Sequence, residues 1–528
     1  MKLRTPDFTH LYLENEIVNI ENTDKAQLEY KQDKGLKVIL KAKELGVCYL
    51  RLRWNEKIRA SVKILGDAWE RGYGNLEWRG ICPERNMPWY FLVSNGSDMN
   101  REYKDRLTEG FGVEVGCNSL AFWQCDSEGV TLWLDIRNGA KPTILTGELE
   151  CATIYFEEYS GISAFSALKE FCRVMSPNPY LADHVVYGSN NWYYAYGKSS
   201  HDEIIEDTKI VKELCKDNEN IPYMVIDDGW QPNPTDAPWN VGNERFPDMK
   251  GLAEEMKKIG VRPGIWVRYL VNGKDDESRK VDIFPEEYYL ERCNKVLDPS
   301  HPKVIEYVKE TTKTLVDWGY QLIKHDFSTF DIFGRWGFEI DGQMARGNWG
   351  FYDNTRTTAQ IIKDFYKAIK DSSNGAVIIG CNAIGHLCAG LHQLNRTGDD
   401  TSGFEWSRTA KMGVNTLAFR LGQNNAFFGA DADCVGITGA IPWELNRQWL
   451  KALSRSGSAL FVSCKPGILN ESELDELREA FKVASVQKDV LIPLDWMENV
   501  CPQYYLLNGE QVEFSWYQKE GNLTYRPW

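Results

Sequence analysis

YMVIDDGW at residues 223–230 and QLIKHDF at residues 321–327 are two apolar runs that each end abruptly in acidic side chains. Apolar runs of this length, bounded by polar residues, are typical of strands in a parallel sheet that is covered on both faces. In barrel enzymes the active site lies at the C-terminal ends of such strands, which is where these carboxylates stand. The two stretches therefore predict an α/β fold whose strands carry acidic residues at one end.

Further strand-like runs accompany these two, and amphipathic helical stretches such as 202–215 and 302–318 lie between most of them. Strands that alternate with helices in this way predict a (β/α)8 TIM barrel. The link between the fifth and sixth runs is short, and the charged stretch 274–280 is predicted to be a solvated loop. The strand-like runs are, in order, 184–188, 223–226, 262–266, 321–324, 376–380, 393–396, 426–429 and 458–462.

The regions on either side of the barrel have a different pattern. Short apolar or alternating runs separated by Gly, Asn and Asp fill residues 1–180, which predicts an N-terminal β-sandwich. Near the end of the chain, the runs 504–507 and 511–514 favour a small hairpin. We therefore expect three domains, with the catalytic barrel at 181–480 and a short C-terminal β-region at 481–528.

Composition limits the classes of partner and the compartment. The 528 residues carry a formal net charge of −15, which repels a polyanion, so no nucleic acid is expected. No signal peptide follows the first residues, and no stretch is long enough to span a membrane. The 13 cysteines lack CxxC spacing, which is typical of reduced thiols in a cytoplasmic protein. No motif predicts a metal or a cofactor; a homo-oligomer is left open.

Polar and aromatic side chains fall at or just after the ends of the predicted strands, so a barrel would gather them at one mouth. Two carboxylates that face one sugar ring are what retaining glycoside hydrolysis requires. One attacks the anomeric carbon, while the other protonates the leaving oxygen and later activates water. Asp431 and Asp433 are expected to be structural. The full set is Trp192, Asp227, Asp228, Trp266, Arg268, Lys324, Asp326, Cys381, Asn382, Arg396, Asp399, Asp400, Asp431 and Asp433.

The electrostatic needs of the two carboxylates differ. Lys324 and Asp326 share one face of their strand because side chains alternate along it. The nearby ammonium favours the ionised form that a nucleophile must have. The acid instead needs a raised pKa. We expect the negative charge of Asp399 to contribute to a raised pKa of Asp400.

Five motifs in a fixed order resemble those of one known family. They are IDDGW at 226–230, PGIW at 263–266, KHDF at 324–327, GCN at 380–382 and RTGDDT at 396–401. Each is weak alone, but their order on successive strands resembles the family-36 glycoside hydrolases, the melibiase-type α-galactosidases, which share a clan with the family-27 enzymes. The resemblance covers about residues 180 to 470, and the upstream β-region resembles the family's N-terminal sandwich. It implies a retaining hydrolase that removes terminal α-galactose from oligosaccharides.

The resemblance also implies roles by position. Asp326 matches the nucleophile, and Asp400 matches the acid/base because it stands four residues after Arg396, with Asp399 as the alternative. The binding residues implied are Asp227 and Asp228 for O4 and O6, Lys324 and Arg396 for ring hydroxyls, Trp192 and Trp266 as pocket lining, Cys381 near C2, and Trp69 reaching in from the sandwich.

The sequence departs from the family pattern at two places, and several functions stay open. His325 replaces an aromatic residue found in many members. The longer members carry a Cys-x-x-Gly-Gly-x-Arg run after the fifth strand, where this chain has Cys381-Asn382-Ala383-Ile384-Gly385. The second departure keeps an α-N-acetylgalactosaminide open as substrate. A raffinose-synthase-like transfer of galactose to another sugar uses the same residues. A carbohydrate-binding protein without catalysis is a further alternative, as is a Mg²⁺-dependent barrel enzyme, against which Lys324 beside the carboxylate argues.

Overall fold

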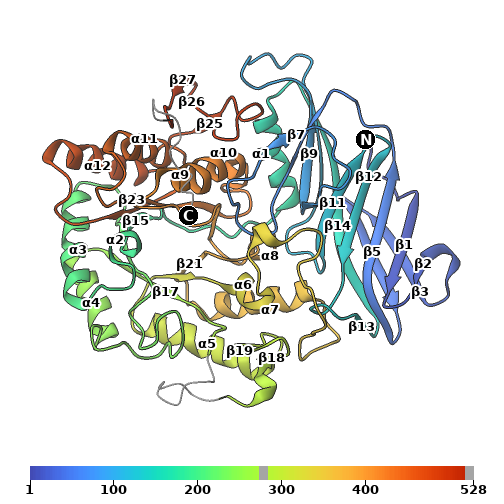
Figure 1. Ribbon diagram of the computed structural model, residues 1–528, viewed down its shortest axis with the longest axis horizontal. Helices are drawn as coiled ribbons and strands as arrows, with labels where there is room; N and C mark the ends of the chain where they lie inside the picture. The colour runs from blue at the N-terminus through green and yellow to red at the C-terminus, as the bar shows by residue number, and fades with distance from the viewer. Residues whose placement is uncertain (273–283, 518–528) are drawn as a thin grey trace, which may run out of the picture.

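The computed structural model describes residues 1–272 and 284–517, so the charged stretch 274–280 lies outside the described residues. Figure 1 shows a sandwich of blue N-terminal strands beside a barrel built from the green to orange part of the chain. The last strands of the described chain form a small sheet near α1 and α10 (Figure 1). The N-terminal sandwich and the C-terminal β-region are therefore confirmed as parts of the fold, whereas the boundaries at 180 and 480 stay a prediction.

The sandwich consists of two antiparallel sheets. Along β5 (Leu45–Asn55), Leu50, Leu52 and Trp54 are fully buried and the residues between them are partly exposed, as in a half-buried strand. The Trp54 ring lies 5.1 Å from that of Phe156 on the opposite sheet, so the core lies between the sheets. One sheet has the order β2 (Ile17–Asn19), β1 (Phe8–Leu13), β5, β12 (Gly129–Asp135), β11 (Leu120–Asp126) and β8 (Met87–Pro88), with β13 (Thr143–Leu145) beside β5. The other has the order β3 (Ala26–Gln32), β4 (Leu36–Ala42), β14 (Glu148–Ser160), β10 (Leu107–Val113), β9 (Tyr90–Ser94), β6 (Lys63–Gly66) and β7 (Trp78–Arg79).

Eight parallel strands close into a barrel, which confirms the predicted (β/α)8 fold class. All residues of the second and fifth strands are buried, because helices cover the outside and side chains fill the inside. The strands are β15 (Tyr187–Asn190), β16 (Tyr223–Ile226), β17 (Arg262–Val267), β20 (Leu322–His325), β21 (Val377–Gly380), β22 (Leu394–Arg396), β23 (Gly429–Ile437) and β24 (Ala459–Cys464).

The longer helices of the barrel begin at clear local signals. Pro302 is the first residue of α5, a position at which the backbone N–H has no partner within the helix, so the missing N–H of proline costs nothing. The helix buries one apolar face. Thr357 and Gln360 form a capping box at the start of α7. The helices are α1 (Ala164–Met175), which precedes the barrel, then α2 (Trp192–Ala195), α3 (His201–Leu214), α4 (Met249–Ile259), α5 (Pro302–Asp317), α6 (Ser328–Phe333), α7 (Thr358–Ser372), α8 (Gly385–Cys388), α9 (Trp406–Thr409), α10 (Thr416–Arg420), α11 (Trp443–Ser454) and α12 (Glu471–Ala484).

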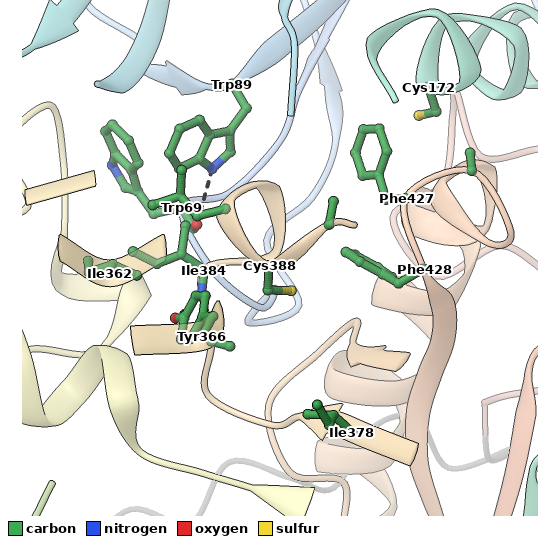
Figure 2. Packing of buried hydrophobic residues seen from close by; sticks show 14 of the residues in the cluster. Trp69, Trp89, Cys172, Ile362, Tyr366, Ile378, Ile384, Cys388, Phe427 and Phe428 are labelled. Atoms are coloured by element: carbon green, nitrogen blue, oxygen red, sulfur yellow. Dashed lines mark hydrogen bonds between the residues drawn. The ribbon is translucent and has the colours of Figure 1, made fainter. Parts of the chain in front are cut away.

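The seventh strand differs most from its predicted range. It begins at Gly429, where the predicted run 426–429 ends, so Asp431 and Asp433 lie within the strand rather than after it. Phe427 precedes the strand and contacts Tyr90 of the sandwich, with ring centroids 6.3 Å apart. Figure 2 shows it among buried side chains from both domains. The apolar run therefore marks burial between two domains, which a sequence pattern does not distinguish from burial in a sheet.

A loop of the sandwich docks onto the barrel. The backbone N–H of Gly72 donates to the carbonyl of Thr397 at 2.8 Å, and the N–H of Asp399 donates to the carbonyl of Gly72 at 2.9 Å. Arg420 also pairs with Asp67 at 2.8 Å. These contacts fix the loop between β6 and β7 against the segment that follows β22.

The C-terminal sheet contains the predicted hairpin, which pairs with one additional strand. Its strands are β25 (Leu491–Pro493), β26 (Tyr504–Leu507) and β27 (Glu510–Glu513). All thirteen cysteines are free thiols. Within residues 1–272 and 284–517, none of the helices combines the length and the apolar character that a membrane crossing requires.

Candidate active site

A cavity of about 410 Å³ lies at the C-terminal ends of the barrel strands. Its walls combine carboxylates, cations and aromatic rings. Of the catalytic and binding residues that the family resemblance implies, all line the cavity except Arg396, Cys381 and Trp69. Arg268, Asn382, Asp431 and Asp433, also expected at this mouth, are not among the lining residues. The lining residues are Arg71, Trp192, Asp227, Asp228, Thr235, Trp266, Lys324, Asp326, Phe327, Trp336, Phe338, Asp399, Asp400 and Arg408.

One part of the cavity is built on a buried ion pair. Lys324 Nζ lies 2.7 Å from Asp227 Oδ2, and Asn190 donates to the same oxygen at 2.6 Å. Burial opposes the charge on Lys324, but the carboxylates of Asp227 and Asp326 and the Cys381 thiol together outweigh it, so the pKa of Lys324 stands well above its usual value. The contact between Lys324 and Asp227 fixes both side chains at the ends of β16 and β20.

Asp228 lies beside this pair and has a different environment. Its Oδ1 accepts hydrogen bonds from the side-chain amide of Gln231 and from the backbone N–H of Thr235. Burial raises the pKa of Asp228, and the neighbouring charge of Asp227 adds to the rise. Two adjacent carboxylates thus offer acceptor oxygens to a ligand in this part of the cavity.

Asp326 follows directly after β20 and faces the cavity. Its Oδ1 accepts from the backbone N–H of Phe327 at 2.7 Å, and its Oδ2 accepts from Trp266 Nε1 at 3.2 Å. Donors at both oxygens hold the carboxylate of Asp326 in one orientation. Phe327 has a φ of 62°, a left-handed conformation that is costly for a bulky residue and sharply turns the chain after Asp326.

His325 points away from Lys324 and Asp326 because side chains alternate along the strand. Its ring is fully buried among the rings of Tyr269, Phe365, Tyr366 and His392. Burial lowers the pKa of His325 to about 4, so the ring is neutral. The imidazole occupies an aromatic core position, which explains how it replaces an aromatic residue of the family pattern.

Arg396 is buried beneath the cavity and contacts three carboxylates. Its Nε lies 3.3 Å from Asp431 Oδ2, its Nη2 lies 3.0 Å from Asp433 Oδ1, and its Nη1 lies 3.1 Å from Asp400 Oδ1. Both aspartates of β23 are thus paired with a buried guanidinium, and the structural role expected of them stays a prediction. The donors of Arg396 are directed at carboxylates, and its predicted contact with ring hydroxyls stays a prediction.

The two acidic residues of the following loop are held differently. Both oxygens of Asp399 are paired, Oδ1 with Arg71 at 2.7 Å and Oδ2 with Arg408 at 2.8 Å. Asp400 is paired through Oδ1 alone, with Arg396 and, at 3.9 Å, with Arg71. Its side chain is 37 % exposed, against 16 % for Asp399. No donor among the described residues contacts Asp400 Oδ2.

The expected rise in the pKa of Asp400 is wrong for this structure. Burial raises the pKa of Asp400, but the positive charges of Arg396, Arg71, Lys324 and Arg408 outweigh it and hold that pKa below its usual value. The charge of Asp399 does not act as expected because two guanidinium groups neutralise it. The sequence alone did not reveal that Arg71 enters the site.

Trp69 does not reach the cavity. It is buried between the sandwich and a loop of the barrel, where its Nε1 donates to the carbonyl of Asp341 at 2.6 Å and its ring stands edge-on to Trp89. Figure 2 shows the two rings side by side, with a hydrogen bond from the Trp89 indole to the Trp69 carbonyl. Arg71, two residues further on, enters the cavity instead and stacks over the Trp336 ring at 5.4 Å. The sequence therefore identified the correct segment but the wrong side chain.

Cys381 is also buried behind the cavity wall. Its Sγ lies 3.9 Å from Arg71 Nη1, and burial raises the pKa of the thiol well above its usual value.

The lining residues that sequence reasoning missed are Arg71, Thr235, Phe327, Trp336, Phe338 and Arg408. Apart from Phe327, which adjoins Asp326, they lie in loops and short helical turns away from strand ends, so no local signal marked them. No cluster of His, Cys, Asp and Glu within the described chain is arranged to hold a metal ion.

Solved structures provide the comparison for this geometry. The α-galactosidase TtGalA of Thermus thermophilus, solved with p-nitrophenyl α-D-galactopyranoside, is 15 % identical with a TM-score of 0.62, and the match covers 97 % of this chain and 98 % of that one. The chain has the fold of the GH36 α-galactosidases. The GH36 enzyme AgaA of Geobacillus stearothermophilus, in complex with 1-deoxygalactonojirimycin, is 13 % identical with a TM-score of 0.60, covering 96 % of this chain and 75 % of that one.

A third structure with this fold is the α-galactosidase of Lactobacillus brevis. It is 12 % identical with a TM-score of 0.60, and the match covers 96 % of this chain and 73 % of that one. No protein-family model and no curated protein sequence matches the chain. The GH36 fold is thus shared with little sequence identity, so the activity has to be argued from the site.

Proposed function

We propose that the protein is a retaining glycoside hydrolase that removes terminal α-galactose from oligosaccharides. The observation that carries the proposal is a single cavity containing two carboxylates in different states of pairing. Asp326 accepts N–H donors at both oxygens, while Asp400 has one oxygen without a donor. Structures with the same fold are α-galactosidases. The free thiols agree with a cytoplasmic enzyme acting on imported sugars.

The reaction has two displacements. In the first, an oxygen of Asp326 attacks the anomeric carbon, the bond to the leaving oxygen breaks, and Asp400 gives that oxygen its proton. In the second, Asp400 takes a proton from water, and the water oxygen attacks the same carbon and releases Asp326. Two inversions leave the product with the configuration of the substrate.

Asp400 suits the acid/base role better than Asp399 by its geometry. The pKa of Asp400 lies below the usual value, so the protonated fraction that the acid step needs is largest at acidic pH. A proton donor needs an oxygen that is free to hold the proton and reach the leaving group. Both oxygens of Asp399 are occupied by guanidinium groups, whereas Oδ2 of Asp400 is available. We assign Asp399 to holding Arg71 and Arg408 in place.

The galactose ring is proposed to bind over the Lys324–Asp227 pair. Asp227 and Asp228 offer adjacent acceptors for the O4 and O6 hydroxyls, and Lys324 offers a donor. Trp192 and Trp266 line the same cavity and offer flat surfaces to the apolar face of the ring. A sugar with the opposite configuration at C4 would direct its O4 hydroxyl away from one of these acceptors. That acceptor would then lack a hydrogen-bond donor, which lowers the affinity for such a sugar.

The first test is hydrolysis of p-nitrophenyl α-D-galactopyranoside without added metal. We expect release of nitrophenol and an α-anomer as the first sugar product, seen by NMR before mutarotation. A β-anomer as first product would overturn the retaining mechanism. No release, followed by release from the α-N-acetylgalactosaminide, would correct the sugar. If neither substrate is hydrolysed but galactose is transferred to a sugar acceptor, the protein is a transferase. If the protein binds sugar without either reaction, it is a lectin-like protein.

The pH dependence of the reaction should respond to Arg71. The protonated fraction of Asp400 falls as the pH rises through its pKa, so kcat/KM falls on that side of the profile. Arg71→Gln removes a positive charge that lowers the pKa of Asp400, so this basic limb is expected to move to higher pH. Arg71→Lys retains the charge and is the matched control. An unmoved basic limb in Arg71→Gln would contradict the assignment of Asp400 as the acid.

A further inference from the structure

A second cavity lies in the outer wall of the barrel, between α3, α12 and the end of β24. Its volume is about 220 Å³, and it shares no lining residue with the catalytic cavity. The two helices are neighbours on the side of the barrel away from the sandwich (Figure 1). Most of the wall is apolar, with Val211 and Leu214 contributed by α3 and Leu474, Leu477 and Phe481 by α12. An apolar body is therefore the main part of any ligand that this cavity fits.

One carboxylate stands in the apolar wall. Asp207 of α3 is 7 % exposed, and its Oδ2 accepts a hydrogen bond from the hydroxyl of Tyr194. No donor of the described chain contacts its Oδ1. Burial raises the pKa of Asp207 to about 6, and the like charges of Glu203 and Glu206 add to the rise. The carboxyl is thus ionised above neutral pH, with one oxygen available to a ligand.

The charge of Asp207 is not balanced by a cation of the described chain. Lys465 also lines the cavity, but its side chain is exposed, and it is not among the charged groups that act on Asp207. Those groups are Glu203 and Glu206, which are acidic as well. A buried charge is normally paired, because removing it from water is costly. The cavity therefore complements a positively charged ligand.

We propose that this cavity is a binding site for a primary amine with an apolar body of about six to eight carbon atoms, whose ammonium group pairs with Asp207. A cavity of about 150 Å³ lined by aliphatic and aromatic side chains holds benzene, so this one has room for a slightly larger body. The body packs between α3 and α12, and the ammonium donates to Oδ1 while Tyr194 keeps its bond to Oδ2.

The head group decides which ligand of a given size binds. An ammonium forms a charge-assisted hydrogen bond with the carboxylate, which is about twice as strong as the neutral bond that an alcohol donates. A carboxylate on the same body would be repelled by Asp207. The apolar wall contributes equally to all three. The expected order of affinity is therefore amine, then alcohol, then acid.

The test is isothermal titration calorimetry of the full chain with n-hexylamine, n-hexanol and hexanoate. At about pH 8 Asp207 is ionised and the amine is protonated, and about 0.15 M salt screens surface carboxylates. We expect one hexylamine per chain, bound about tenfold more tightly than hexanol, and no binding of hexanoate. Methylamine has the charge without the apolar body and should not bind.

Variants assign the effect to Asp207. Asp207→Asn keeps an acceptor for the hydroxyl of Tyr194 but removes the charge, so hexylamine and hexanol should bind equally. Glu213→Gln removes an exposed carboxylate of the same helix and is the matched control, which should keep the preference for the amine. Lys465→Gln removes a positive charge from the cavity wall and should leave hexylamine binding unchanged or make it tighter.

Several outcomes would overturn the amine site. They are equal affinity of the wild type for hexylamine and hexanol, tighter binding of hexanoate, or no binding of any probe. Methylamine bound as tightly as hexylamine would show attraction to surface charge alone. A preference for the amine that survives in Asp207→Asn would remove Asp207 from the site. None of these measurements uses a galactoside, so the proposed function is tested separately.

Discussion

Replacing Asp326 by asparagine is expected to lower the turnover of p-nitrophenyl α-D-galactopyranoside by about 10⁴- to 10⁶-fold, the range seen when one member of a catalytic unit is removed. The amide has nearly the shape of the carboxylate, and its oxygen still accepts the N–H of Phe327. It carries no negative charge and is a poor nucleophile, so the glycosyl-enzyme bond does not form. The loss should appear in kcat, measured under steady state, with an unchanged thermal transition.

A rescue experiment separates a nucleophile from a residue that only positions the sugar. Asp326→Gly opens space beside the anomeric carbon, and azide can enter from the face that the carboxylate used. The expected product is β-galactosyl azide, with inverted configuration and a rate that increases with azide concentration. Asp475→Asn, an exposed carboxylate of α12, is the matched control and should keep full activity. Activity that survives in Asp326→Asn would remove the nucleophile assignment.

Arg396→Met is expected to destabilise the barrel by about 3–5 kcal/mol, the cost of leaving a buried charge without its partner. The substitution removes the guanidinium that contacts Asp400, Asp431 and Asp433. The two strand aspartates are buried, so water cannot replace the lost contacts. The measurement is the urea midpoint of the barrel transition, followed by tryptophan fluorescence and circular dichroism.

Second substitutions test whether the loss comes from unpaired charge. Asp433→Asn in the Arg396→Met background should recover part of the lost stability, because it removes one of the charges left behind. Arg447→Met breaks an exposed pair with Glu476 on the outer helices and should cost at most about 1 kcal/mol. If Arg396→Met were as stable as Arg447→Met, the contacts of Arg396 with the three aspartates would not stabilise the barrel, and the prediction would be wrong.

Most of the barrel could be predicted from local pattern. Six of the eight strands overlap their predicted ranges by three residues or more, because strands buried on both faces have continuous apolar runs. The first and seventh strands are the exceptions. Phe427 and Phe428 belong to an apolar run that packs near the sandwich, and burial of that kind has the same signature as burial in a sheet. The short link before the sixth strand contains only the single turn of α8.

Sequence reasoning predicted those residues of the site that lie at the ends of barrel strands. Lys324 and Asp326 were expected on one face, and both line the cavity because alternation along a strand is a local property. The gathering of Asp227, Asp228, Trp192 and Trp266 around them follows from barrel closure. Trp69 was expected in the cavity but is buried between the sandwich and the barrel, since nothing local tells which side chain of a loop turns toward the cavity.

The sequence by itself determined the strands, their order and the carboxylates at their ends, because each depends on residues close together in the chain. Only the tertiary structure decided which charged groups surround Asp399 and Asp400. Arg71 reaches Asp399 from more than three hundred positions away through the Gly72 contacts, and Arg396 meets Asp431 and Asp433 across two strands. Charge interactions depend on distance in space and on burial, and neither is encoded by spacing along the chain.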